Sequence, residues 1–281
     1  MSKTETVYVQ RFNVFARLLH LTVIISFLTL ALTGMALKFA DEPWAGTIAA
    51  VFGSFRVLGV LHRIGAVLTF GYFFLHFILI FQNWRKTDRS LVSFILDKTI
   101  GMVPNIQDVK EIGQTLKWFV GAGDRPRYGR WTYWEKFDYF AVFWGVAVIG
   151  LTGICLWFPE WVTQFFPGSW LNIATIIHSD EALLATGFIF TIHFFNTHIR
   201  PEKWPLDRVI FTGTITLDEL KHERPREYEM LVEEGRLDDV IVDRPPLWLI
   251  IFSYVFGFSA LTIGMILVFT IIYTIFKMTF L

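Results

Sequence analysis

Long runs of apolar residues, separated by shorter polar stretches, organise the whole chain. Five runs are long enough to cross a hydrocarbon core of about 30 Å as helices. We expect these helices at residues 18–37, 57–81, 139–158, 170–199 and 247–276. Charge within the runs is sparse: Arg63 lies early in the second, and Asp180 and Glu181 interrupt the fourth. The pattern predicts an all-α fold, an integral membrane helical bundle with a fifth, C-terminal transmembrane helix.

Glycine and proline mark where the runs stop. We expect the first helix to end near Thr33-Gly34. The fourth should end at Arg200-Pro201, since proline ends or kinks a helix before it. Between the second and third runs, residues 90–100 are expected to form a short helix on the membrane surface.

Composition agrees with a membrane protein, and the distribution of charge orients it. Of the 281 residues, 54% are hydrophobic and 18% are charged, a combination that is rare in soluble domains. The net charge of zero gives no indication of a nucleic-acid partner. Ten Lys/Arg lie in residues 83–136 and eight in 200–246, whereas 38–56 holds two and 159–169 none. By the positive-inside rule, the N-terminus and both basic loops are expected to be cytoplasmic.

This order predicts three parts along the chain. They are a four-helix domain at 1–205, a charged cytoplasmic helical segment at 206–246 and a fifth transmembrane helix at 247–281. Thr216 and Glu219 have the spacing of a capping box that would begin the helical part of the middle segment. Such a segment is usually a solvated surface, and docking to a cytoplasmic partner is the alternative. A lone cysteine, Cys155, excludes an intrachain disulfide and a cysteine-ligated zinc or iron–sulfur site.

Six of the seven histidines lie inside or at the end of the apolar runs, where ionisable residues are rare and mark functional sites. They are His20, His62, His76, His178, His193 and His198. His62 and His76 are 14 residues apart, and His178 and His193 are 15 apart. Either pair spans roughly 21–23 Å of helix axis on nearly one face. Two facing helices of this kind would offer imidazoles at two depths, as in bundles that hold two stacked bis-histidine haems.

The predicted topology assigns the histidines to two sites. His62 and His178 lie near the outer face and are the candidates for an outer pair. The inner site has more candidates than it needs, namely His20, His76, His193 and His198. His193 is the better ligand from the fourth helix, because His198 lies about 140° further round. The partner of His193 is either His20 or His76, with geometry slightly favouring His76, and three haems on six histidines is a further alternative.

Charged residues beside the histidines have two interpretations. Arg17, Arg56 and Arg63 would suit the carboxylates of haem propionates, and anchoring to lipid headgroups explains them equally well. Asp180 and Glu181 could orient His178 or be solvated at the membrane interface.

Short motifs in a fixed order resemble a known family. They are Arg17-Leu-Leu-His20 with Thr33-Gly34, Leu61-His62-Arg63-Ile64-Gly65, Lys136 followed by residues 151–159, and Ile177-His178 through His193-Phe194. Over roughly residues 10–205 they resemble the cytochrome b subunits of membrane formate dehydrogenases and nickel–iron hydrogenases.

The resemblance implies a four-helix core with two b haems, the outer held by His62 and His178 and the inner by His20 and His193. It leaves His76 and His198 as extra histidines. In the family, the two fourth-helix ligands are typically one residue closer than they are here, so a small local adjustment is expected. Family members reduce quinone near the inner haem. Here the corresponding pocket would include Thr132, Trp134, Lys136 and Asn196.

We therefore interpret the chain as the haem b cytochrome subunit of a respiratory oxidoreductase complex in the bacterial or archaeal cytoplasmic membrane. It would pass electrons between a partner, an iron–sulfur or multihaem subunit, and the quinone pool. Residues 206–281 lie outside the resemblance. Two other classes of protein remain as alternatives, a membrane anchor for soluble redox subunits and a proton or metal-ion transporter that uses intramembrane histidines.

Overall fold

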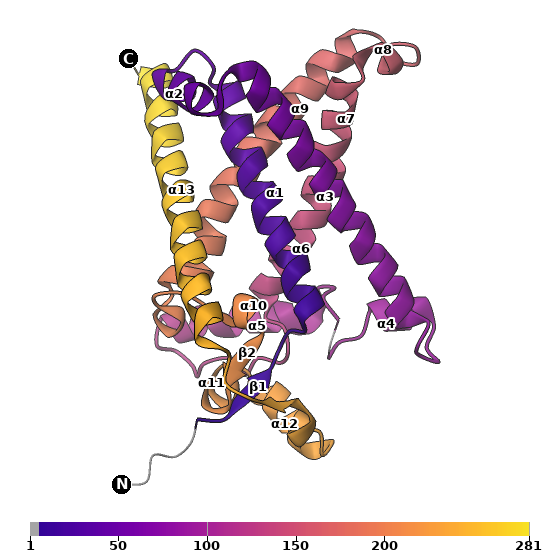
Figure 1. Ribbon diagram of the computed structural model, residues 1–281. Coiled ribbons are helices and arrows are strands. Elements are labelled where there is room, and N and C mark those ends of the chain that lie inside the picture. The colour runs from indigo at the N-terminus through magenta and orange to yellow at the C-terminus, as the bar shows by residue number, and fades with distance from the viewer. Residues whose placement is uncertain (1–5, 100, 281) are drawn as a thin grey trace. The chain divides into compact units, whose positions relative to one another are not determined.

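The computed structural model describes residues 6–99 and 101–280. The first five residues of the predicted cytoplasmic N-terminus, Ile100 at the end of the predicted surface helix, and Leu281 lie outside the described residues. Helices make up most of the described chain (Figure 1). The predicted all-α fold class is therefore confirmed.

Five helices are long and apolar enough to cross a membrane, and they match the five predicted runs. They are α1 (Val14–Lys38), α3 (Phe55–Trp84), a third span Tyr133–Trp157, a fourth span Ser169–Ile199 and α13 (Leu247–Phe280). The third consists of α6 (Tyr133–Gly145), η1 (Val146–Gly150) and α7 (Leu151–Trp157). The fourth consists of α9 (Ser169–Phe188), η2 (Ile189–His193) and η3 (Phe195–Ile199). The segments η1, η2 and η3 are π-helical, so each takes up an extra residue per turn.

The predicted end of the first helix is wrong. α1 continues through Thr33-Gly34 to Lys38. Glycine costs roughly 1 kcal/mol in a helix interior relative to alanine, but a backbone group left unpaired in the membrane costs more. The fourth span does end where predicted, because Arg200, with φ −54° and ψ 132°, adopts the extended conformation favoured before proline.

Shorter elements fill the connections. They are α2 (Pro43–Phe52), α4 (Leu91–Ile95), α5 (Ile106–Phe119), α8 (Pro159–Val162), η4 (Pro201–Lys203), α10 (Val209–Thr212), α11 (Leu217–Glu223), α12 (Pro225–Glu233) and η5 (Asp238–Val240). Thr216 and Glu219 form the predicted capping box at the start of α11. The helix α5 was not predicted from the sequence, and a second capping box, made by Asn105 and Asp108, begins it.

The chain forms two compact units, each assembled from three separate stretches. Unit 1 contains the described residues up to Arg17, Phe77–Val142 and Arg208–Ile250. Unit 2 contains Leu18–His76, Phe143–Asp207 and the described residues from Ile251 onward.

A small antiparallel sheet lies in unit 1 and was not predicted. Its strands are β1 (Tyr8–Gln10), β2 (Thr214–Thr216) and β3 (Ile241–Val242), in the order β2-β1-β3. Val9 pairs with Ile215 and Ile241, and its side chain is buried against those of Leu220 and Leu231. Tyr8–Gln10 therefore form a structural strand of unit 1.

The core of unit 2 joins three of the spans. Its buried side chains come from α1, from the end of the fourth span and from α13: Ala31, Met35, Phe39, Phe190, Phe194, Ala260, Leu267, Val268 and Ile271. A second cluster of small residues, Ala36, Ala45 and Ala49 with Leu58, lets α1, α2 and α3 approach closely. The fifth helix is therefore an integral part of this core.

Candidate functional site

Two histidines from different spans face each other in unit 2. The ring centres of His62, on α3, and His178, on α9, are 6.1 Å apart, and their planes are inclined at 75°. Two imidazoles that bind one metal from opposite sides, through bonds of about 2 Å, have ring centres roughly 6 Å apart. The observed distance fits a pair of axial ligands.

A threonine on α1 orients His62. The Nδ1 atom of His62 lies 3.0 Å from Oγ1 of Thr33. The single hydroxyl proton of Thr33 is donated to the carbonyl of Thr29 at 2.6 Å, so the Thr33 oxygen accepts from His62. His62 also forms a hydrogen bond with the backbone of Leu30.

A second threonine repeats this arrangement at His178. Nδ1 of His178 donates to the carbonyl of Ile149 at 2.9 Å and lies 3.4 Å from Oγ1 of Thr152. Thr152 in turn donates to the carbonyl of Val148 at 2.6 Å. Ile149 belongs to the π-helical segment η1, and such segments occur often at functional sites.

These contacts assign the tautomer of both rings. With Nδ1 as the donor in each, the other ring nitrogen, Nε2, carries the lone pair that can bind a metal. Metal-binding histidines almost always donate their second nitrogen to a carbonyl or another acceptor in this way. The donor pattern of His62 and His178 therefore suits ligation of iron.

Glycine follows each of the two threonines and leaves room for the ring. A Cβ at Gly34 would lie 3.0 Å from Cε1 of His62, and one at Gly153 would lie 2.9 Å from Cε1 of His178. Each histidine therefore packs on a Thr-Gly pair of a neighbouring span. We call these two pairs, Thr33-Gly34 and Thr152-Gly153, the histidine seats.

The protein supplies only two ligand side chains at this point. Within residues 6–99 and 101–280, no three His, Cys, Asp or Glu side chains gather to hold a metal ion. A bare ion normally takes four or more ligands. A pair of imidazoles is complete only if a group such as a porphyrin provides the rest, which favours haem over a bare ion.

The inner histidines gather around His193. His193 is close enough to both His20 and His198 to interact electrostatically with each. The Nδ1 atoms of His20 and His198 are buried and have no hydrogen-bond partner within the described part of the chain. Buried polar atoms of this kind are rare and require an explanation, such as a bound group.

The other two inner candidates have neighbours of their own. His198 is 5% exposed, packs on Phe194 with ring centres 5.2 Å apart, and bonds to the backbone of Pro205. His76 packs against Phe143 with ring centres 6.1 Å apart. Neither contact assigns a ligand, so the inner pairing stays a prediction.

The fourth span contains a π-helical turn, η2, that bears on the spacing of its two histidines. The turn consists of five residues, Ile189–His193, and its last residue is the inner histidine of the fourth span. One residue is absorbed by the wider turn. The turn therefore changes the rotation between His178 and His193 relative to a regular α-helix.

The charged residues flanking the histidines lie in different environments. Arg17 donates Nε to the carbonyl of Phe211 at 2.7 Å, which fixes it to unit 1. The guanidinium of Arg63 lies 5.8 Å from the ring of Trp157, and Arg56 is exposed. Asp180 pairs with Lys38 at 2.9 Å, which gives this acidic residue a partner on α1.

The residues predicted for a quinone pocket are divided between the units. Thr132, Trp134 and Lys136 belong to unit 1, and Asn196 belongs to unit 2. Thr132 is 1% exposed and donates to Glu135, while Lys136 is 4% exposed and lies 3.0 Å from Asp108. These two side chains have structural partners, and their link to quinone stays a prediction.

Buried ion pairs hold unit 1 together. They join the N-terminal strand, α5, the start of α6 and the 206–246 segment: Arg11–Glu227, Arg130–Glu227, Arg224–Glu135, Lys136–Asp108 and Arg226–Glu111. Burial, reinforced by the charge of Arg224, lowers the pKa of Arg11 to about 10. Burial also raises the pKa of Glu111, against the opposing charge of Arg226. Part of the charge in 206–246 is therefore internal, not the solvated surface expected.

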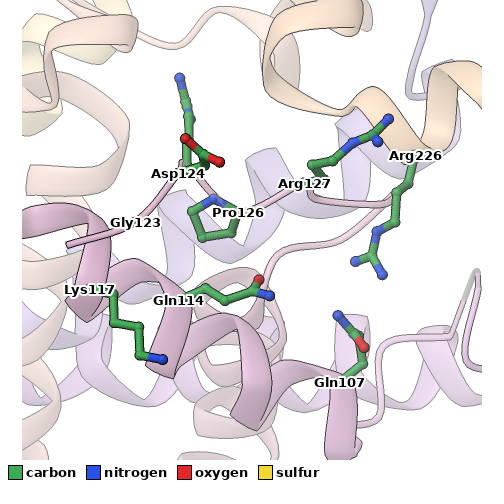
Figure 2. Close-up of a pocket in the computed structure, with 9 residues that line it drawn as sticks. Gln107, Gln114, Lys117, Gly123, Asp124, Pro126, Arg127 and Arg226 are labelled. Carbon is green, nitrogen blue, oxygen red and sulfur yellow. The ribbon is translucent and has the colours of Figure 1, made fainter. Parts of the chain in front are cut away.

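Unit 1 also has an open basic pocket of about 400 Å³ beside α5. Figure 2 shows Gln107, Gln114 and Lys117 on one side, and Arg127 and Arg226 across from them. Arg127 pairs with Glu229 and Arg226 with Glu111. Because these cations already have carboxylate partners, the pocket is a weaker candidate site than the paired histidines.

The comparisons with known proteins agree with the motifs. No family model matches the chain. It is 23% identical over 230 residues to the cytochrome b556(Fdn) subunit of the nitrate-inducible formate dehydrogenase of Escherichia coli strain K12, covering 81% of this chain and 93% of the relative. The same subunit from Escherichia coli O157:H7 and from Shigella flexneri matches with equal identity and coverage.

This likeness confirms the predicted resemblance to the formate dehydrogenase cytochrome b family. Together with the five apolar helices, it indicates a multi-pass membrane protein. The match covers more of the chain than the motifs did.

Proposed function

We propose that this chain, which resembles formate dehydrogenase cytochrome b subunits, is the b-type cytochrome membrane subunit of a respiratory oxidoreductase complex. It carries two haems and passes electrons between a partner redox subunit and the quinone pool. Residues 1–205 form the four-helix domain that binds haem, 206–246 is the cytoplasmic segment, and 247–281 is the added fifth helix.

One observation carries the haem proposal. His62 and His178 lie 6.1 Å apart between ring centres, and each donates Nδ1 to an acceptor on a neighbouring span, α1 for His62 and the third span for His178. Each ring thereby keeps an Nε2 lone pair available for a metal, and no third His, Cys, Asp or Glu joins them within the described part of the chain. For the inner haem we propose His20 and His193, on the family pattern and on the proximity of the two side chains.

Haem held by these histidines would supply reversible one-electron transfer rather than oxygen binding. The role of the protein is to position the haems and to shield them from water. The histidine seats hold the rings and fix their tautomers, and the apolar spans exclude water, which tunes the potential. Arg17, Arg56 and Arg63 are the proposed partners of the propionates.

The assembly of this protein follows the same proposal. The relatives are named as subunits of formate dehydrogenase, so we propose that this chain also joins other redox subunits. The protein would be located in the bacterial or archaeal cytoplasmic membrane, with its N-terminus in the cytoplasm. Quinone is the proposed electron partner on the inner side.

Haem per polypeptide, measured by the pyridine haemochrome method on purified protein in detergent, tests the proposal. Wild type should hold two haems. The His62→Ala and His178→Ala variants should lose the same haem, so the absorption spectrum of the remaining haem should be identical in the two. The His20→Ala and His193→Ala variants should both lose the other haem. The His76→Ala and His198→Ala variants are controls that should retain both.

The alternatives give different results. Loss of the inner haem in the His76→Ala variant, but not in His20→Ala, would move the inner site to α3. Three haems in wild type would bring in His76 and His198 as ligands. A wild-type protein without haem would end the cytochrome proposal.

A further inference from the structure

The helix α5 exposes a stripe of apolar side chains and buries three polar ones. Ile106, Val109, Leu116 and Phe119 are 69%, 63%, 61% and 69% exposed. Their spacing of three, seven and three residues puts them in one stripe of a 3.6-residue helix. On another face of the helix, Asp108, Glu111 and Thr115 are only 5%, 1% and 4% exposed. A surface helix in water has the reverse arrangement.

The contacts of the buried side fix this orientation. Asp108 lies 3.0 Å from Nζ of Lys136, and Oγ1 of Thr115 lies 2.9 Å from the hydroxyl of Tyr128. Glu111 pairs with Arg226. Rotating the helix to bury its apolar stripe would break all three contacts and leave buried charges unpaired. The exposed stripe is therefore a fixed feature of unit 1.

The position of α5 in the chain places the stripe at a membrane surface. Lys136 belongs to the first turn of the third span, which begins at Tyr133. The ion pair with Asp108 therefore holds α5 beside the point where the chain enters the membrane. The end of the second span, Phe77–Trp84, belongs to the same unit.

Charge along the helix complements a phospholipid surface. Lys110 and Lys117 are exposed and, seven residues apart, lie on one flank of the apolar stripe. Lysine side chains in this position can lay their stems along apolar groups and place the ammonium groups among lipid phosphates. A helix with one apolar face and flanking lysines is typical of segments that lie in the membrane interface.

We propose that α5 is an in-plane membrane helix. Its apolar stripe inserts among the acyl chains of the leaflet next to unit 1, and Lys110 and Lys117 pair with anionic headgroups. The occupant of the stripe is lipid, because the helix is tied to the start of a span and its flanking charge is cationic. This inference does not depend on haem binding.

Nitroxide labels at single cysteines test the proposal directly. The native thiol is removed by Cys155→Ala, and labels are placed at Val109→Cys, Leu116→Cys and, as a control on another face, Gln114→Cys. The full-length protein is put in nanodiscs of phosphatidylcholine with 30% phosphatidylglycerol. Electron paramagnetic resonance then compares collisions with oxygen, which enriches in lipid, and with a water-soluble nickel chelate.

Labels at 109 and 116 should collide several-fold more with oxygen than with nickel, and the label at 114 should show the opposite preference. Nickel-accessible labels at 109 and 116 would place the stripe in water and overturn the proposal. Labels shielded from both reagents would mean that protein, such as a second copy of the chain, covers the stripe, which overturns it equally.

A second arm tests the headgroup contacts. With the label at Leu116→Cys, the double change Lys110→Gln and Lys117→Gln should reduce immersion in discs that contain phosphatidylglycerol. It should have little effect in discs of phosphatidylcholine alone. Equal effects in both lipids would contradict the pairing with anionic headgroups.

Discussion

At the scale of single residues, the two histidine seats determine which ring nitrogen of His62 and His178 is available to bind a metal. Thr33 and Thr152 each give their hydroxyl proton to their own helix, four residues back, and so present an acceptor to a ring on another helix. A hydroxyl that was free to turn could either donate or accept. The local helix thereby decides the tautomer of a distant histidine.

Replacement of Gly153 by alanine should disturb His178 selectively. The new Cβ would lie 2.9 Å from Cε1 of the ring, closer than normal contact, and the ring must shift. Changes to residues that contact a metal ligand typically lower metal affinity by about 10–100-fold. We expect reduced haem content and an altered low-spin electron paramagnetic resonance signal from the outer site. Gly59→Ala, on the helix of His62 with open space around its Cβ, should leave both unchanged.

The sequence alone singled out the histidines as candidates but did not indicate which groups hold them. Depth in the membrane was enough to pair His62 with His178. Thr33-Gly34 was interpreted as a helix end, and Thr152-Gly153 had no role, because a hydrogen bond between helices depends on their relative rotation. The signal in the sequence that could have indicated the seats is the Thr-Gly pair, which occurs in the first and in the third apolar run.

At the scale of elements, helix existence could be predicted and helix detail could not. The apolar runs predicted all five membrane helices, because length and hydropathy decide that question in a bilayer. The π-helical turns and the strand at Tyr8–Gln10 depend on partners elsewhere in the chain. The helix α5 was missed because charged and apolar residues alternate along its sequence.

The fifth helix, α13, packs closely against the fourth span. Gly264 of α13 lies against the ring of Phe190, and a Cβ there would overlap the ring. We expect Gly264→Ala to lower the free energy of unfolding by about 1–3 kcal/mol, as overpacked cores do. Thermal unfolding in detergent would measure this. Gly187→Ala, on the helix of Phe190 but with open space, is the matched control, and equal stability of the two variants would contradict the packing.

At the scale of the whole molecule, the small sheet constrains the topology. β1, near the N-terminus, pairs with β2 and β3, which follow the fourth span. Both partners must lie on one side of the membrane, so an even number of crossings separates them. Four spans between them satisfy this requirement.

Labelling from one side of the membrane should report the orientation. In a Cys155→Ala background, Trp161→Cys lies in the short loop after the third span, and Arg236→Cys lies in the 206–246 segment. Both native side chains are 59% exposed. An impermeant maleimide should react with Trp161→Cys on intact spheroplasts and with Arg236→Cys only after permeabilisation. The opposite pattern would invert the proposed topology.

The sheet also sets an order of events during synthesis. During synthesis, Thr216 follows its partner Tyr8 by more than 200 residues. At roughly 5–20 residues per second, β1 waits about 10–40 s for that partner. Through this interval four spans enter the membrane beside a strand with two unpaired edges, which are sites for association with other chains. Closure of the sheet thus marks a nascent chain that has been translated past its fourth span, and a truncated chain would keep the edges that chaperones and proteases recognise.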